Sequence, residues 1–134
     1  MHRFLFVSLG VLTLLFLASC SVPQNAAAPP TAKVAGKVML DGKPMASGEI
    51  QFVIPGQPPK TCSIKDGAFS GDAFTGRNKV EVVHFIDGPP STTDPNVKTT
   101  INTVAPQFSG PDTKLAAEVP PTGVSSLEFA VTSK

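Results

Sequence analysis

The stretch VAGKVMLDGKPMASGEIQFV, residues 34–53, holds two short runs in which apolar and polar residues alternate around a turn signal. The apolar positions that share a face are Val34, Val38, Leu40, Ile50 and Phe52. A period of two residues is typical of a β-strand with one buried face. Asp41-Gly42, between the runs, is a frequent tight hairpin turn. The stretch therefore indicates antiparallel strands rather than helices.

The same alternation continues along the rest of the chain, without an apolar stripe of helical period. The expected strands are 34–40, 48–54, 61–65, 68–70, 78–86, 115–119 and 127–131, with a weaker strand-like stretch at 99–104. Alternation slips after Val83, which predicts a bulge near His84. Because no helix is expected to cover a sheet, the strands must pack on one another. The sequence therefore predicts an all-β, seven-stranded antiparallel β-sandwich over residues 33–134, with all 14 prolines outside strand interiors.

The start of the chain has the three parts of a signal peptide. A charged start ending at Arg3 is followed by an apolar run over residues 4–16 and then by small residues. The run is too short for a membrane-spanning helix, so residues 1–19 are expected to form a signal-peptide helix outside the fold. Leu17-Ala18-Ser19-Cys20 resembles the bacterial lipobox, which implies cleavage before Cys20 and acylation of its thiol. An ordinary secretory signal with a chance cysteine is the alternative.

Residues 20–32 carry three prolines and no periodicity, which is the composition of a flexible tether. Two or three acyl chains on Cys20 would make membrane anchoring effectively permanent. The lipobox resemblance further implies a location in the cell envelope facing the periplasm. Ser21, rather than an aspartate, follows the cysteine and favours the outer membrane over the inner one.

Composition restricts the classes of partner. The part after the signal peptide is long enough for one domain with its own core. The chain has 11 basic and 10 acidic residues and no basic run, so nothing favours nucleic acid. If Cys20 is acylated, Cys62 has no partner within the chain; a buried, inert thiol is expected and a reactive one is the alternative.

Three stretches together resemble a known family. VAGKVMLDGKPMASGEIQFV, SIKDGAFSG (residues 63–71) and TGRNKVEVV (residues 75–83) are similar to the turn and strand motifs of carboxypeptidase regulatory-like domains. Thr75 and Asn78 depart from the family's usual proline and tyrosine. The resemblance is greatest to the small planctomycete lipoproteins that carry this domain alone. It implies a transthyretin-like sandwich and, since the zinc peptidase domain of the carboxypeptidases is missing from this sequence, no peptidase activity.

Residues with catalytic or metal-binding chemistry are few. His84 is the only histidine after the signal peptide, so no metal or other cofactor is expected, and a hydrogen-bonded histidine at a strand end is the prediction. Counting residues leaves a Ser-His-Asp site open, but no Gly-x-Ser-x-Gly motif accompanies it. Asp41, Asp66 and Asp87 each precede glycine and are expected in turns rather than in calcium loops. The chain is therefore predicted not to be an enzyme, with no catalytic residue.

The remaining hypotheses concern binding. The first is a non-catalytic interaction or structural module that docks an unknown envelope protein through a sheet edge or the loops 87–98 and 107–114. The alternative is a module that binds a small ligand or glycan at the loop ends of the sandwich. The chain has no Trp or Tyr, the aromatic residues on which sugar sites usually depend. Most phenylalanines are expected to point inward; Phe74 and Phe108 are the two that could line a contact patch, with a place at the core edge preferred.

Overall fold

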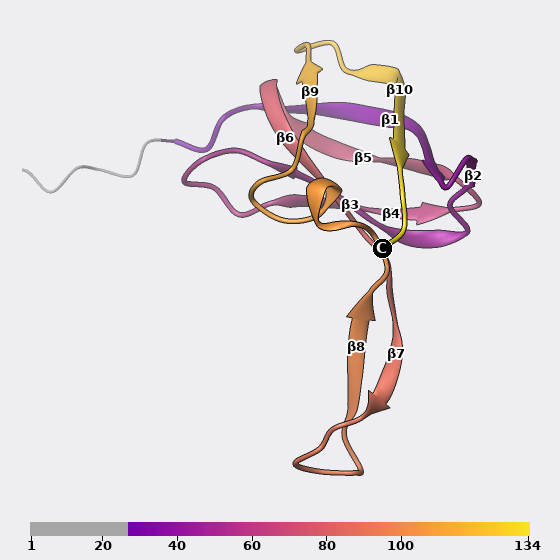
Figure 1. Cartoon of the computed structure of the whole chain (residues 1–134). Helices are drawn as coiled ribbons and strands as arrows, with labels where there is room; N and C mark the ends of the chain where they lie inside the picture. The colour runs from indigo at the N-terminus through magenta and orange to yellow at the C-terminus, as the bar shows by residue number, and fades with distance from the viewer. Residues whose placement is uncertain (1–26) are drawn as a thin grey trace, which may run out of the picture.

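The computed structural model describes residues 27–134, which fold almost entirely as β-structure (Figure 1). The elements are β1 (Thr31–Leu40), β2 (Lys43–Pro44), β3 (Ser47–Val53), β4 (Lys60–Lys65), β5 (Ala68–Phe74), β6 (Gly76–Val83), β7 (Phe85–Pro90), β8 (Lys98–Asn102), the 3-10 turn η1 (Pro106–Phe108), β9 (Leu115–Val119) and β10 (Val124–Val131). The predicted all-β fold is confirmed. Within residues 27–134 there is no helix with the length and apolar character to span a membrane.

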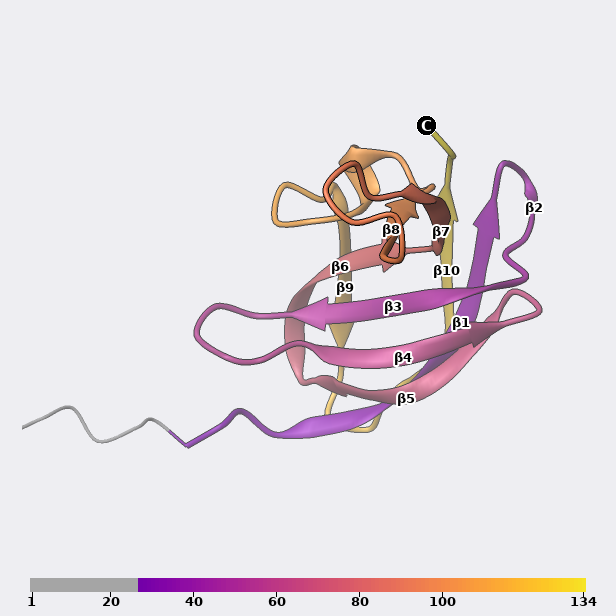
Figure 2. The same ribbon diagram turned by 90° about the horizontal axis from the view of Figure 1, so that it is seen from below.

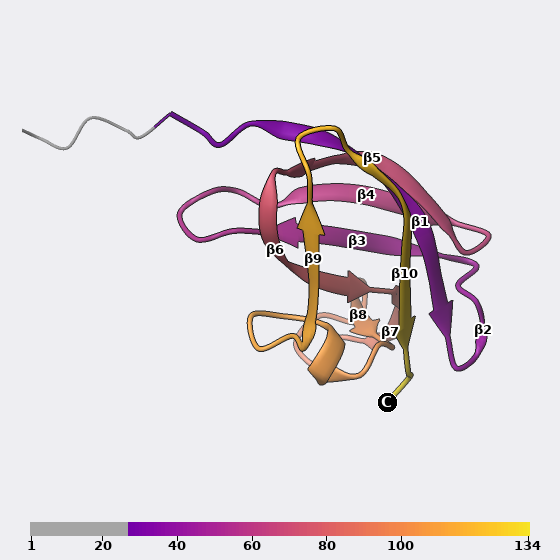
Figure 3. The same ribbon diagram turned by 90° about the horizontal axis from the view of Figure 1, so that it is seen from above.

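Eight strands form one curled sheet in the order β10-β1-β5-β4-β3-β6-β9, with β2 paired to β1. Seen from below, β3, β4 and β5 lie side by side as one wall (Figure 2). Seen from above, β9 and β10 cross in front of these three strands, so the sheet folds over its own inner face (Figure 3). The two walls enclose the apolar side chains in a sandwich-like arrangement.

Two long strands belong to both walls. β1 pairs with β5 along Thr31–Lys37 and with β10 up to Leu40. β6 pairs with β9 along Gly76–Val80 and with β3 along Lys79–Val83. A strand shared in this way turns the sheet around a corner. The curl of the sheet therefore depends on β1 and β6.

The core is built from the inward positions of the alternating runs. Fully buried large side chains are Phe52, Phe74, Met45, Ile50, Ile64, Val34, Val38, Val80, Val82, Val104, Val119 and Val131. The ring of Phe69 lies 6.0 Å from that of Phe52 and 6.3 Å from that of Phe129, measured between centroids. Phe52 and Phe69 come from one wall and Phe129 from the other, so aromatic packing joins the two walls.

The Asp-Gly signals form the predicted turns. Asp41 and Gly42 have φ angles of 51° and 77°, and Asp66 and Gly67 have 50° and 79°. Two successive positive φ angles define the tight turn that matches the twist of a hairpin. Asp tolerates this left-handed conformation better than most residues, and Gly adopts it freely. These dipeptides therefore determine where β1 turns into β2 and β4 into β5.

The structure corrects the strand count and one pairing of the expected sandwich. Residues 27–134 contain ten strands rather than seven. β1 and β10 run parallel, whereas an antiparallel arrangement was expected throughout. A parallel pair needs a long connection between its strands, and here nearly the whole domain provides it. β1 also begins at Thr31, inside the expected tether, because Ala32 is buried and pairs with Ala73 of β5.

The expected strand over residues 78–86 ends earlier. β6 stops at Val83, His84 belongs to neither strand, and β7 leaves the body at Phe85. The slip in alternation therefore marks a departure from the sheet rather than a bulge within it. Pro89 lies in the interior of β7, contrary to expectation, whereas Pro44 and Pro90 are the last residues of β2 and β7. They are tolerated because β2 and β7 lie at edges, where a missing N–H removes no hydrogen bond.

Candidate functional site

The feature that separates this chain from a simple sandwich is a two-stranded ribbon, β7 and β8, that projects from the body (Figure 1). The sequence predicted a loop over most of this region. The ribbon carries all of the exposed large apolar side chains of the described part of the chain, which are Phe85 (58% exposed), Ile86 (45%), Val97 (53%) and Ile101 (42%). Phe85 was expected to point inward. Single exposed apolar residues are common, but several on one projecting element make that element the candidate contact surface.

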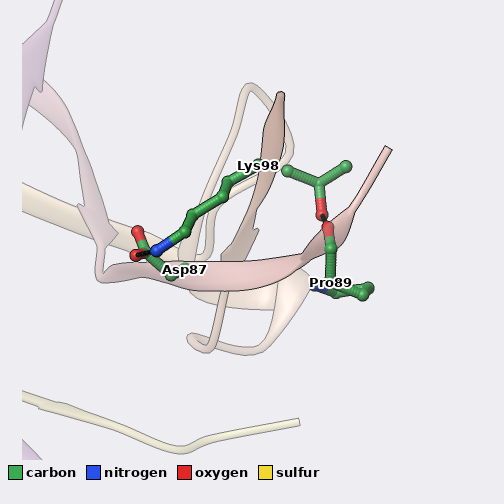
Figure 4. Close-up of polar contacts among 4 residues, drawn as sticks. Asp87, Pro89 and Lys98 are labelled. Carbon is green, nitrogen blue, oxygen red and sulfur yellow. Dashed lines mark hydrogen bonds and ion pairs between the residues drawn. The ribbon is translucent and has the colours of Figure 1, made fainter. Parts of the chain in front are cut away.

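The two faces of the ribbon differ in chemistry, although Phe85 lies on the same face as Asp87. Ile86 and Ile101 lie directly opposite each other, so they form an apolar pair on one face. Asp87 and Thr100 lie opposite each other on the other face, where Lys98 Nζ is 3.0 Å from Asp87 Oδ2 (Figure 4). Asp87 is thus a strand residue in an exposed ion pair, not a turn former. The charges of the ribbon are largely satisfied within it, while its apolar pair has no cover.

Internal hydrogen bonds hold the tip of the ribbon in shape. Thr99 Oγ1 donates to the carbonyl of Pro89 over 2.7 Å, where the register between the strands shifts. Ser91 N donates to the Val97 carbonyl over 2.7 Å, and Asp94 Oδ1 accepts from Asn96 N at 2.9 Å. A side chain that accepts from the backbone two residues later is a typical turn-forming contact. Apart from the exposed Val97 the tip is polar, and the other exposed apolar side chains lie along the two strands of the ribbon.

Asn102 and His84 fix the base of the ribbon. Asn102 Oδ1 accepts from the backbone N–H of His84 at 3.1 Å and of Val104 at 3.2 Å. His84 Nδ1 lies 2.8 Å from Thr103 Oγ1, and its Nε2 lies 3.3 Å from Ser47 Oγ. The histidine at the strand end is therefore hydrogen-bonded, as predicted, and it links the ribbon to β3.

The arrangement of Ser47, His84 and Thr103 partly resembles a catalytic triad. A serine hydroxyl beside a histidine is the core of an activated nucleophile. The second ring nitrogen, however, faces the Thr103 hydroxyl rather than a carboxylate, so no negative charge opposes an imidazolium ion. Asp41 lines the same shallow hollow, but its Oδ1 accepts from Ser133 N at 2.9 Å. The geometry supports a structural link between ribbon and body.

A second surface feature is an apolar hollow of about 390 Å³ on the outer side of β3 and β6. It is lined by Val53, Ile54, Pro55, Arg77, Lys79, Glu81 and Pro111. Lys79 Nζ donates to the carbonyl of Pro111 over 2.8 Å and so closes one side. The hollow falls within the size range of small-ligand sites, and its charged rim could orient a polar group. It brings the predicted loop 107–114 next to the loop that follows β3.

The other residues singled out from the sequence lie in different places. Leu17, Ala18, Ser19 and Cys20 lie outside the described residues. Cys62 is buried as expected, and burial raises the pKa of its thiol. Phe74 is fully buried and Phe108 packs against the core, which agrees with the preferred place for both. Within residues 27–134 there is no cluster of three or more His, Cys, Asp or Glu that could hold a metal ion.

Sequence patterns missed two buried polar residues. Asn78 is fully buried, and its Nδ2 donates to the carbonyls of Phe74 at 2.7 Å and Gly76 at 3.0 Å. Thr113 Oγ1 donates to the Val80 carbonyl over 2.6 Å and fastens the loop before β9 to β6. Asn78 lies two residues before Val80, on the same face of the strand, and this spacing could have indicated that Asn78 is buried. Nothing in the local sequence marks Thr113.

Comparison with known proteins gives distant likenesses. No protein-family model and no curated protein matches this chain. Among solved structures, the chain is similar to a DUF3823 family protein from Parabacteroides merdae ATCC 43184, with 18% identity and a TM-score of 0.39 over 78% of this chain and 47% of that one. It is also similar to a 9R-lipoxygenase from Cyanothece PCC8801, with 14% identity and a TM-score of 0.38 over 84% of this chain and 18% of that one. The chain thus spans about half of the first neighbour and under a fifth of the second.

Proposed function

We propose that this protein is a lipid-anchored, non-catalytic interaction module of the bacterial cell envelope, which docks a protein partner through the β7–β8 ribbon. The observation that carries the proposal is the confinement of the exposed large apolar side chains of residues 27–134 to this one projecting element. Burying apolar surface contributes about 25 cal/mol per Å², so uncovered side chains of this kind favour association.

The proposed anchor places this ribbon at a membrane surface. Cys20 would carry the acyl chains, in the outer membrane by preference, and the residues between it and Thr31 would form the tether. Tethering restricts the domain to a thin layer and raises the local concentration of any partner in that layer. A weak contact through a small surface would then be sufficient.

We further propose that the domain is of the carboxypeptidase regulatory-like type. The Asp41-Gly42 and Asp66-Gly67 turns lie between strands, as the motifs of that family require, and the fold is sandwich-like. In carboxypeptidases this domain accompanies a catalytic domain and does not itself carry the chemistry. This relationship supports a non-catalytic role here.

A photo-crosslinking experiment in intact envelopes tests the proposal. A photoreactive residue replaces Ile101 in the full chain, and the matched control carries it at Thr92, an exposed residue of the polar tip. We expect a discrete protein adduct from position 101 that is absent or much weaker from position 92. Equal, diffuse labelling at both positions would count against docking through the ribbon.

A companion variant separates binding from folding. The double substitution Ile86→Thr and Ile101→Thr keeps β-branched residues in the strands but removes apolar surface. We expect the adduct, now read from a photoreactive residue at Val97, to be lost, while the thermal midpoint of the body changes little because both isoleucines are exposed. An unchanged adduct would exclude this apolar pair as the contact.

The apolar hollow beside β3 and β6 favours a second candidate function, binding of a small ligand. Its floor of Val53, Ile54, Pro55 and Pro111 would take an apolar group, and the Arg77 side of its rim would take a polar or anionic one. A ligand of the native state raises the thermal midpoint in proportion to its occupancy. We therefore expect envelope sugars or small amphiphilic anions to raise the midpoint of the wild type but not of Val53→Trp, which fills the hollow. No shift with any of them would remove this candidate.

A further inference from the structure

Resting on the proposed function, we infer that the partner of the ribbon is a second copy of this chain, and that the outer edge of β8 pairs antiparallel with the same edge of the copy. The two edges of the ribbon are unequal. On β7, Pro89 and Pro90 lack the N–H that an added strand would need. On β8, residues 98–102 contain no proline, and within residues 27–134 their outer edge pairs with no strand.

The ladder shows which groups of β8 face outward. Thr103 N donates to the His84 carbonyl over 2.9 Å, and Thr103 lies opposite His84 in the continued register. Hydrogen-bonded and non-hydrogen-bonded pairs alternate along an antiparallel ladder. The backbone groups of Lys98, Thr100 and Asn102 therefore point away from β7 and are free to pair with a new strand.

Charge selects the register of that pairing. Centring the two-fold axis on Lys98 would oppose two ammonium groups, which is unfavourable. Centring it on Asn102 would bring each body against the other, because the chain re-enters the body at Thr103. Centring it on Thr100 places Lys98 opposite the uncharged Asn102 of the copy, and Lys98 already pairs with Asp87 within its own ribbon. This register opposes no like charges.

The same register also extends the apolar face. Ile101 falls opposite Thr99 of the copy, so two β-branched residues meet beside the existing Ile86–Ile101 pair. Because the strands run antiparallel, the base of one ribbon lies beside the tip of the other, and the two bodies sit at opposite ends. A two-stranded ribbon is marginal in water, whereas a sheet of three or more strands with a hydrophobic face can be stable. Self-pairing is thus an isologous contact that satisfies the open backbone edge of β8.

Introduction of a charge at Thr100 tests this inference, because the residue would face its own copy across the two-fold axis. We would measure sedimentation equilibrium of the full chain in density-matched detergent for wild type, Thr100→Lys, Thr100→Glu and their equimolar mixture. We expect a concentration-dependent dimer for wild type and a dissociation constant raised at least about tenfold for each variant alone. The mixture should regain the dimer, since opposite charges then face each other. Thr92→Lys and Thr92→Glu at the tip are the controls and should behave as wild type.

The outcomes separate this inference from the function on which it rests. A wild type that stays monomeric at every concentration, or Thr100 variants that dimerise unchanged, overturns self-pairing through β8. If the protein is monomeric while the Ile101 photo-crosslinker captures a different protein, the interaction module stands with another partner. If the protein is monomeric and no adduct forms, both self-pairing and the proposed interaction module are excluded. The inference is supported if the wild type dimerises, each Thr100 variant alone dimerises more weakly, and the mixture of the two variants regains the dimer.

Discussion

Gly36 of β1 lies so close to Leu127 of β10 that a Cβ atom on Gly36 would overlap the Leu127 backbone carbonyl. The contact coincides with the register shift between Val34 and Gly36, where β1 joins the two walls of the sheet. Glycine is required here by space and not by a left-handed backbone. The one parallel pair of strands in the main sheet thus depends on the absence of a side chain.

Gly36→Ala should therefore destabilise the domain. Forcing a methyl group into a packed site costs roughly 1–3 kcal/mol, and here the obstacle is backbone, which cannot rotate away. Urea unfolding followed by far-UV circular dichroism would measure the change in the free energy of unfolding. Gly56→Ala is the control, because Gly56 has a φ of 77° but nothing within 4 Å of its Cβ position, so only about 1 kcal/mol of backbone strain is expected. Equal losses for both variants would contradict the steric argument.

The Asn102 amide should control the order of the ribbon. Asn102→Ala removes the acceptor for the N–H groups of His84 and Val104, at a cost of about 1–2 kcal/mol for partly buried donors. Amide hydrogen exchange measured by NMR should become faster throughout β7 and β8, with little change in β3 and β4. Asn102→Asp keeps an oxygen acceptor at the same place and should retain most of the protection. Exchange that stays slow in the ribbon of the alanine variant would show that the base is held by other contacts.

The local alternation of apolar and polar residues predicted the strands of one wall. It failed to predict pairings that depend on contacts between distant parts of the chain. Ile50 and Phe52 are buried because a period of two fixes the face of a strand once any neighbour covers it. The parallel pairing of β1 with β10 has no local signal, since the partners lie at opposite ends of the domain. Met45, which is buried, lies outside the predicted strands for the same reason, and the buried Val104 ends the weaker predicted stretch at 99–104.

The ribbon shows the same limit for the candidate site. Residues 87–98 are rich in Gly, Pro, Ser and Thr, so composition indicated a loop, and its use as a docking element was an open possibility. Its strand character comes from contacts between its own two halves, such as Thr99 with Pro89 and Lys98 with Asp87. Ile86 ended the expected strand 78–86 and Ile101 lay within the weaker stretch 99–104, and the departure of the chain at His84 exposes both.

Cys62 should react only when the domain unfolds. Its side chain is 3% exposed, and its Sγ fills the space where a Cβ on Gly71 would lie. Burial raises the pKa of the thiol, so little of the reactive thiolate forms even at mildly alkaline pH. In detergent-extracted protein we expect negligible labelling of Cys62 by iodoacetamide without urea and rapid labelling above the unfolding midpoint, located by peptide mass. Labelling of the native protein at the rate of an exposed thiol would show that the β4–β5 contact opens readily.

Asp41 should make the attachment of the last residues sensitive to acid. Its carboxylate accepts the Ser133 backbone N–H at 2.9 Å, and this bond, together with one from the Ser133 side chain, lowers the pKa of Asp41 below its ordinary value of 3.8. A carboxyl group whose pKa is lower in the folded state stabilises that state at pH values above the ordinary pKa. The contribution is lost as the pH falls through 3.8 and then through the lowered folded-state pKa.

We therefore expect the Ser133 amide resonance to hold its position from neutral pH to about pH 4 and to move toward its random-coil position only below that. An NMR titration of the wild type beside Asp41→Asn measures this, because asparagine keeps the acceptor oxygen but does not titrate. The variant should show no acid transition at Ser133. A wild-type transition centred above 3.8, or the same transition in both proteins, would mean that another carboxyl group governs this end of β10.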